Sequence, residues 1–291
     1  MDNMVNQKSA YVSIVCSQNY IVGLLATYFS LKQTGTHYPL YAMMPQRLVE
    51  ECKHEVDILK NVGIHVIGYT NSVELPEELL KNNAKQGDNR FSYTFDKLKI
   101  FELTQFDKIV FIDSDIYILQ SLDRLFDMPH MSAMIAGNSF PGNEDWKDLT
   151  SGIMTIVPQD GLLKQFEAII PMVMKEKPSC GDQDILQAYY AEWPNRPDLN
   201  MGEKYGVIAG YASYYENQLG YYYSNDTNDD KAVAIVHFAG EKKPWMQHWG
   251  VLSIMKQELE LVWLHLSKKR NTRCVLLEYN KLIRKAKRML K

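Results

Sequence analysis

Short apolar runs alternate with amphipathic segments along the first 70 residues. The runs at 11–16, 39–44 and 64–67 predict three buried strands. Helix-spaced apolar positions between them predict one helix from about Tyr20 and a second that stops near Gly63. These apolar positions are Leu24, Leu25, Tyr28 and Leu31 in the first helix and Leu48, Cys52, Val56 and Leu59 in the second. The β-α-β-α-β order predicts an α/β fold with a mainly parallel, Rossmann-like sheet flanked by helices.

A further helix is predicted at 94–106, and the buried strand that follows it, at 108–112, stops abruptly at Asp113-Ser114-Asp115. In open α/β sheets, ligands bind beyond the carboxyl ends of the strands. Two carboxylates at this place could hold a divalent cation, which would take its other ligands from a diphosphate and from water. The alternative is that both aspartates only cap the turn after the strand.

The second half of the chain is less regular. Strands are predicted at 116–119, 132–136, 152–157 and 231–238, with a helical turn at 122–126 and a helix at 161–174. A turn rich in side-chain oxygens at 180–184 opens another helix, and Asp182 is either its N-cap or a group near the reaction centre. Residues 195–230 are rich in Tyr and Asn, which makes them a candidate wall of an acceptor site.

His237 ends the predicted strand at 231–238, as Asp113 ends its own strand. Such a histidine is often structural. With Asp113 and Asp115, however, it would make a mixed oxygen and nitrogen site that suits Mn²⁺ better than Mg²⁺. Lys243 follows six residues later and could reach phosphate oxygens. A cation and a lysine would neutralise the charge that grows on a departing diphosphate, so the pattern indicates displacement of such a leaving group.

Composition indicates an ordered, globular protein. The 291 residues are 46% hydrophobic and 23% charged, and the four cysteines are too far apart in sequence to suggest a zinc site. Unpaired thiols and the absence of a secretory or membrane-spanning segment predict a cytoplasmic location. The first strand is not followed by G-x-G-x-x-G, so an ordinary dinucleotide site is not supported, and the Gly-rich, Arg-containing loop of a nucleotide-sugar pyrophosphorylase is missing as well.

Charge is distributed unevenly along the chain. From Lys268 onward there are ten Lys or Arg and one acidic residue, whereas the preceding part has 22 basic and 34 acidic residues. An acidic body makes nucleic acid an improbable partner. The basic end carries apolar residues at helical spacing, which predicts an amphipathic helix that is either solvated or attached to the inner face of an anionic membrane. That apolar stripe consists of Leu276, Tyr279, Leu282, Ile283, Ala286, Met289 and Leu290.

Several motifs in this order resemble the glycosyltransferases of family 8, the group that includes glycogenin and bacterial lipopolysaccharide α-galactosyl- and glucosyltransferases. The motifs are Lys97-Leu98, 103–108, Phe111-Ile112-Asp113-Ser114-Asp115, Ser151-Gly152, 181–186 and His237-Phe238-x-Gly240-x-x-Lys243-Pro244-Trp245. The resemblance covers residues 11–250. It implies a single GT-A domain, a UDP-hexose donor, Mn²⁺ with Mg²⁺ as the alternative ion, and retention of anomeric configuration.

By position, the resemblance also implies roles for individual residues. It assigns the metal to Asp113, Asp115 and His237, the uridine to Val15, Ser17 and Tyr20, the donor sugar to Lys97 and Gln183, and the diphosphate to Gly240 and Lys243. Ser114 and Ser151 join the donor contacts. For Lys97, spacing alone favours a solvated surface lysine. Thr150 and Gly206 depart from the pattern common in the family, which leaves the sugar and the acceptor open.

The catalytic residues predicted are Gln183 and Asp182. An amide is a poor nucleophile, so we expect same-face displacement in which the leaving diphosphate acts as base, Gln183 stabilises the cation-like sugar, and Asp182 positions sugar or acceptor. The expected organisation is a GT-A catalytic domain at 1–265, with a nucleotide-binding half (1–120) and an acceptor half (121–265), and a basic tail at 266–291. The alternatives are glycogenin-like self-glucosylation of a tyrosine such as Tyr221, Tyr222 or Tyr223, and a non-catalytic nucleotide-sugar-binding protein.

Overall fold

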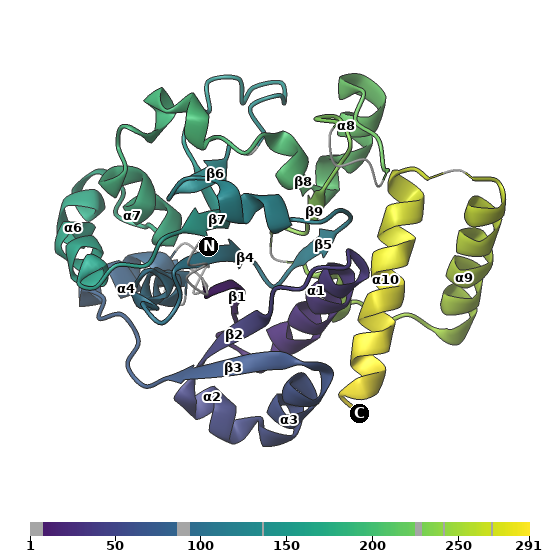
Figure 1. Ribbon diagram of the computed structural model, residues 1–291, viewed down its shortest axis with the longest axis horizontal. Coiled ribbons are helices and arrows are strands. Elements are labelled where there is room, and N and C mark those ends of the chain that lie inside the picture. Colours follow the sequence, from purple (N-terminus) through teal and green to yellow (C-terminus); the bar gives the residue numbers. More distant parts are fainter. Residues whose placement is uncertain (1–7, 86–93, 136, 225–228, 241, 269) are drawn as a thin grey trace, which may run out of the picture.

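A computed structural model describes residues 8–85, 94–135, 137–224, 229–240, 242–268 and 270–291 (Figure 1). Its main sheet has six strands in the order β3-β2-β1-β4-β7-β6. The first four are parallel, and β7 and β6 are each antiparallel to their neighbour. The strands are β1 (Ser9–Ile14), β2 (Leu40–Pro45), β3 (Ile64–Tyr69), β4 (Lys108–Ile112), β6 (Ser132–Met134) and β7 (Thr150–Ile156). The predicted α/β class with a mainly parallel sheet is confirmed.

Two hydrophobic cores lie on the two faces of this sheet, because successive side chains of a strand point to opposite sides. In β4, Val110 and Ile112 enter one core, whereas Ile109 and Phe111 enter the other. Helices cover both faces (Figure 1). The α-helices that the structure describes are α1 (Ile21–Gln33), α2 (Gln46–Glu51), α3 (Lys53–Val62), α4 (Glu77–Lys85), α6 (Leu162–Glu176), α7 (Asp182–Tyr189), α8 (Ala212–Leu219), α9 (Val251–Leu266) and α10 (Thr272–Met289).

Two predicted helices differ from the structure. The segment with Leu48 and Leu59 is broken at Cys52 into α2 and α3, and Gly63 ends α3 with a left-handed backbone, φ 100°. The segment predicted as a helix at 94–106 is a 3₁₀ helix at Phe95–Glu102. Leu98 and Phe101 are buried there as expected, because three-residue and four-residue spacings place apolar groups on nearly the same face.

A second sheet of three strands lies beside the carboxyl end of β4. Its order is β5-β9-β8, with β5 at Ile116–Ile118, β8 at Val207–Ile208 and β9 at Ile235–His237. Strand β9 is shorter than the predicted strand at 231–238. Strands β5 and β9 are antiparallel, and their register pairs Ile116 with His237. Because β5 begins just after Asp115, this pairing brings the end of β9 to the end of β4.

The C-terminal helix α10 is part of the packed body. Its apolar stripe was predicted either to be solvated or to contact a membrane, but Tyr279, Leu282, Ile283 and Ala286 are buried in the same core as α1. Helix α10 lies alongside α1, between it and α9 (Figure 1). The amphipathic pattern thus has a simpler cause, since packing on a protein core and lying on a membrane require the same spacing. Among the described residues, no helix combines the length and apolar character needed to cross a bilayer.

Candidate active site

Three side chains that can bind metal converge where β4 and β9 end. His237 Nε2 lies 3.2 Å from Asp115 Oδ1 and 3.8 Å from Asp113 Oδ2. One potential ligand atom of each residue lies within 4.8 Å of the other two. The backbone fixes both aspartates, because Asp113 N–H donates to the Gly152 carbonyl of β7 and the Asp115 carbonyl accepts from Phe238 N–H. The arrangement can hold a divalent cation through two carboxylates and one imidazole.

The protonation of this cluster follows from burial and opposite charges. Burial alone would raise the pKa of Asp115, but His237 and Lys243 together lower it well below its ordinary value. Burial, Asp115 and Asp182 raise the pKa of Asp113, although Lys97 and His237 oppose this. Burial alone would lower the pKa of His237, but the two aspartates raise it. Asp115 is therefore the permanently charged carboxylate of the cluster.

Lys97 is buried at the centre of a polar network. Its ammonium lies 3.3 Å from Asp113 Oδ1 and 3.2 Å from Asp182 Oδ2, and it donates to both the carbonyl and the hydroxyl of Ser151. Burial alone would lower the pKa of Lys97, but Asp113 and Asp182 raise it, so the side chain remains a cation. The alternative of a solvated surface lysine is thus wrong. Spacing could not reveal this, because the partners come from β4, β7 and α7.

Asp182 and Gln183 lie at the start of α7. Gly181 is the N-cap of this helix and Asp182 is its first residue, so Asp182 is not itself the N-cap. The capping contact comes from Asp184, whose carboxylate accepts a hydrogen bond from Gly181 N–H at 2.9 Å. Gln183 Oε1 accepts a hydrogen bond from Ser151 N–H at 3.2 Å. Both side chains are thereby held beside β7.

A cavity of about 210 Å³ opens beside this network. Its lining includes Asp113, His237, Ser151 and Gln183, so predicted metal and sugar residues share one space. Thr150, where the sequence departs from the family pattern, lines it as well.

The other predicted donor residues lie around this edge with different exposure. Ser17 is exposed, whereas the side chain of Val15 is buried in the core, so Val15 could contact a ligand only through its backbone. The ring of Tyr20 packs edge-on against Trp245 at 5.6 Å. Lys243 is buried and donates to Asp115 Oδ2 and to the Phe238 carbonyl.

Two further predicted donor positions complete this edge. Ser114 is buried between the two aspartates. Gly240 has a left-handed backbone, φ 100°, which favours glycine at the turn after β9.

Comparisons with known proteins show which family the chain resembles. Residues 11–148 match the model of glycosyl transferase family 8. This part of the chain is similar to that family. Glycogenin of Neurospora crassa is 26% identical over 82% of this chain and 32% of its own length. Glycogenin-1 of Caenorhabditis elegans is 25% identical over 81% of this chain and 50% of its own length. The chain thus spans between a third and a half of the length of these curated relatives.

A solved structure shows the same fold. The apo form of the glycosyltransferase GlyE of Streptococcus pneumoniae TIGR4 superposes with a TM-score of 0.52 at 17% identity, and the match covers 96% of this chain and 63% of GlyE. The chain therefore has the GT-A fold that was predicted.

Sequence reasoning gave no role to one residue of this site, Gly152. A Cβ atom on Gly152 would lie 2.9 Å from His237 Cε1 and 3.4 Å from Asp113 Oδ2. The glycine therefore allows the imidazole to lie against β7. A glycine inside a strand is the sequence signal of such a close approach, and it could have been used here.

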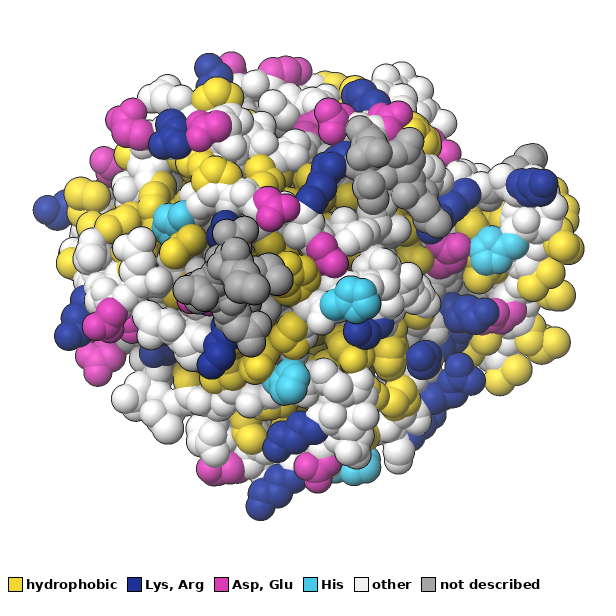
Figure 2. Space-filling view, viewed as in Figure 1, with side chains coloured by type: hydrophobic (Ala, Val, Ile, Leu, Met, Phe, Trp, Pro, Cys, Tyr) yellow, Lys and Arg dark blue, Asp and Glu magenta, His cyan; other side chains and the backbone are white. Residues whose placement is uncertain are grey.

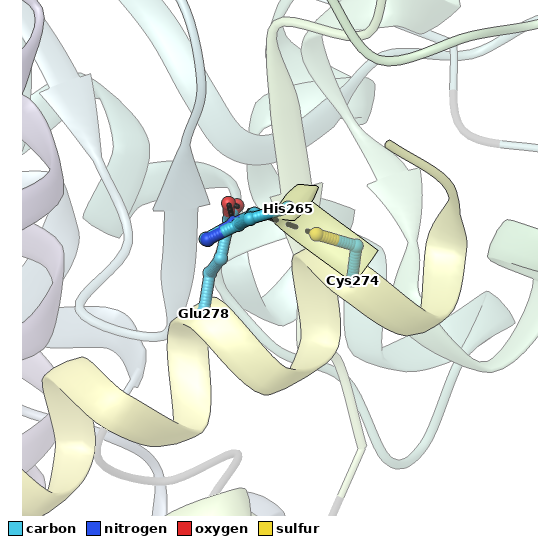
Figure 3. Close-up of side chains that lie close together, drawn as sticks. All are labelled: His265, Cys274 and Glu278. Atoms are coloured by element: carbon cyan, nitrogen blue, oxygen red, sulfur yellow. Dashed lines mark hydrogen bonds and ion pairs between the residues drawn. The ribbon is translucent and has the colours of Figure 1, made fainter. Parts of the chain in front are cut away.

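A second group of possible metal ligands joins α9 to α10, away from the cavity. His265, Cys274 and Glu278 point toward one another (Figure 3). Glu278 already accepts hydrogen bonds from Tyr117 and His265 and is paired with Arg270. Burial and Glu278 raise the pKa of the Cys274 thiol to about 11, so the thiolate that a metal needs is scarce. We interpret this cluster as a contact between the two helices.

Proposed function

We propose that the protein is a retaining hexosyltransferase that moves glucose or galactose from a UDP-sugar to a glycan, lipopolysaccharide or other glycolipid acceptor in an Mn²⁺-dependent reaction. One observation carries the proposal: Asp113, Asp115 and His237 meet beside a cavity that also contains Gln183. Sugar transfer from a nucleotide diphosphate requires charge stabilisation at the diphosphate next to a sugar-sized space.

The residues at the metal position fit a divalent cation. Asp113, Asp115 and His237 would hold it and leave coordination positions for phosphate oxygens and water. When bound, Mn²⁺ supplies positive charge that stabilises the departing diphosphate. The mixed ligand set favours Mn²⁺, with Mg²⁺ as the alternative ion.

The donor would lie along the edge formed by β1, β4 and β9. The backbone of Val15, with Ser17 and Tyr20, would hold the uridine. The Lys243 ammonium would exchange a carboxylate partner for a phosphate oxygen beside Gly240, since both acceptors carry negative charge. The donor sugar would contact Lys97 and Gln183, with Ser151 beside them and Ser114 on the turn between the metal ligands.

The pairing of Asp182 with Lys97 favours same-face displacement over a covalent intermediate. A carboxylate neutralised by an ammonium at 3.2 Å is a weak nucleophile. The Gln183 amide is held by Ser151 and can stabilise a cation-like sugar through its carbonyl dipole. The acceptor hydroxyl would then give its proton to the leaving diphosphate oxygen, on the same face of the sugar. Asp182 acts in this scheme through Lys97, which it positions.

A second cavity, of about 580 Å³, is the proposed acceptor site. Phe140 and Tyr211 stack there with ring centroids 4.3 Å apart, and Tyr214 and Asn143 complete the lining. Ile208 lines both cavities, so they are neighbours. Aromatic faces with an amide beside them suit the apolar face and the hydroxyls of a sugar ring.

Self-glucosylation is the second enzymatic candidate. The side chains of Tyr221 and Tyr223 are buried, and Tyr223 exchanges a hydrogen bond with Thr272. Tyr222 is half-exposed, and its hydroxyl donates to Asp229. Of these three tyrosines, Tyr222 is the remaining candidate acceptor. Mass spectrometry after incubation with donor alone distinguishes self-glucosylation from transfer to a separate acceptor, because only self-glucosylation adds a hexose to the protein.

The decisive experiment is a panel of UDP- and GDP-sugars tested for hydrolysis with Mn²⁺, with Mg²⁺ and with chelator. We expect hydrolysis of UDP-glucose or UDP-galactose that needs Mn²⁺ and is lost in Asp115→Asn. Binding without turnover of any sugar nucleotide would instead support the non-catalytic binder. We further propose a cytoplasmic location with peripheral attachment to the inner face of the membrane, for which residues 268–291 supply positive charge.

A further inference from the structure

Helix α9 presents a continuous apolar face to solvent. Seven large apolar side chains on it are more than half exposed, from 54% for Val262 to 79% for Leu266. Their spacing of three or four residues places them along one side of the helix over its whole length. They are Val251, Leu252, Met255, Leu259, Val262, Trp263 and Leu266. In Figure 2 hydrophobic side chains form the outer edge of the molecule where α9 lies.

The opposite side of α9 is fixed to α10, so the apolar face cannot turn inward. Leu261 and Leu264 pack with Cys274 and Leu277 of α10. Glu260 forms two hydrogen bonds with Arg273, at 2.8 and 2.7 Å, and His265 contacts Glu278 at 2.9 Å (Figure 3). The apolar and polar partners of α9 named here thus lie on α10, and the apolar face remains more than half exposed among the residues that the structure describes.

Positive charge flanks this face. Lys256 lies on α9 itself and is exposed, and Lys268 follows its end. Helix α10 runs alongside and adds exposed basic side chains, of which Lys281 lies 4.0 Å from Glu258 of α9 and Lys285 lies over the Phe29 ring of α1. Figure 2 shows Lys and Arg side chains next to the apolar edge. The region after residue 267 holds ten basic residues and one acidic residue, whereas the rest of the chain is acidic. The face therefore suits an anionic partner.

We propose that α9 lies flat in the interface of an anionic phospholipid membrane, with its apolar face among the acyl chains and the basic residues beside it on the headgroups. A long helix with Trp and Leu on one side and flanking Lys and Arg has the character of an interfacial anchor. The proposed function supplies only the reason for membrane binding, which is access to a lipid-linked acceptor. The sequence predicted that the apolar stripe of α10 could contact the membrane. Because that stripe is buried, we assign the membrane contact to α9.

A second copy of the chain is a less suitable occupant. In a twofold dimer the same surface meets itself, so the basic flanks of the two copies would face each other and repel. Such a dimer also needs roughly 800 Å² from each partner, more than the width of one helix readily supplies. An anionic bilayer satisfies both the apolar face and its basic border.

Vesicle co-sedimentation of the full chain tests the proposal. We expect binding to vesicles of phosphatidylglycerol and phosphatidylethanolamine, and at least tenfold weaker binding to phosphatidylcholine. The variant Leu259→Ser/Trp263→Ser should lower the partition coefficient on anionic vesicles about tenfold or more. The matched control, Leu80→Ser/Met172→Ser, replaces two exposed apolar residues outside α9 and should change it less than twofold.

Two results would overturn the proposal. One is equal binding of the wild type and the α9 variant. The other is a dimer in light scattering that the α9 variant dissociates, with no vesicle binding by the wild type. Mn²⁺-dependent hydrolysis of the UDP-sugar should be the same in all these proteins. A loss of hydrolysis throughout would count against the proposed function and leave the membrane contact standing.

Discussion

The candidate active site at the edge of the main sheet buries charged side chains, whereas the outer face of α9 exposes apolar side chains. At the edge, Lys97, Asp115, Asp182 and Lys243 are buried although they are charged. On α9, apolar side chains such as Leu266 are exposed. The buried charges are balanced by one another, so each depends on its partners, whereas the exposed apolar groups have few partners within the chain. Substitutions at the edge should therefore disturb both folding and chemistry, and substitutions on α9 should disturb neither.

The strongest test of this contrast is Lys97→Met. Removal of the ammonium leaves the buried Asp182 without its counter-charge and leaves the half-buried Asp113 with His237 alone as a neighbour that can carry positive charge. We expect the free energy of unfolding to fall by about 3–5 kcal/mol, as for other broken buried pairs, and transfer to fall below detection. Urea titration followed by circular dichroism measures the first effect. Lys81→Met, at an exposed lysine paired with Glu77, should cost less than about 1 kcal/mol.

Gly152→Ala should separate metal binding from folding. The added methyl group lies 2.9 Å from His237 Cε1, so the imidazole must move. We expect the Mn²⁺ concentration for half-maximal hydrolysis to rise about 10- to 100-fold, the range found when a ligand loses its orientation. Gly210→Ala is the control, because its Cβ would meet no atom within 4 Å. An unchanged Mn²⁺ requirement in Gly152→Ala would argue against His237 as a ligand.

His130 offers the case of a buried group that avoids charge. Burial lowers its pKa to about 4, from an ordinary value of 6.5. Its Nδ1 accepts a hydrogen bond from Val157 N–H at 3.0 Å, which protonation would break. The unfolded chain takes up this proton below about pH 6.5 and the folded chain does not, so stability falls as the pH drops.

Between about pH 7 and about pH 5 the free energy of unfolding should fall by about 1–2 kcal/mol from His130 alone. His130→Phe should show a shallower pH dependence in thermal unfolding scans. If both proteins lose the same stability over this interval, the histidine is not the group that titrates.

The smallest effect is expected at the proposed acceptor site. Tyr211→Ala removes the ring that stacks on Phe140 and should raise the acceptor KM about three- to tenfold, since aromatic contacts contribute about 0.5–1.5 kcal/mol. Hydrolysis of the donor without acceptor should not change. Tyr189→Ala, which removes a ring packed on Phe166 outside this cavity, is the control. A fall in donor hydrolysis in Tyr211→Ala would indicate that this cavity binds the donor and not the acceptor.

Local patterns predict the strands and the ends at which the ligands lie. The apolar run before Asp113 is long enough to define a buried strand, whereas the two carboxylates at its end could hold an ion or cap the turn. The pairing of β5 with β9 could not be predicted in the same way, since it joins residues about 120 positions apart. The ordered motifs, and not the spacing, indicated that His237 would lie beside Asp115.

The two C-terminal helices show what sequence periodicity cannot predict. An apolar periodicity reports that a helix has a face to bury and says nothing of what covers it. The stripe of α10 is covered by α1, as Tyr279 and Ile283 show, whereas the outer side of α9 is exposed in the part of the chain that the structure describes. Only the tertiary arrangement of α1, α10 and α9 distinguishes the two.

The turn Asp113-Ser114-Asp115 is also the joint between two sheets. Asp113 bonds through its backbone to β7 of the main sheet, and Asp115 bonds through its backbone to the residue after β9 of the small sheet. Anything that clamps these two carboxylates together also clamps the sheets, so ligand binding at this joint is coupled to the cooperativity of unfolding. The two aspartates that would anchor a leaving group therefore also join the ends of two sheets that share one hydrophobic core.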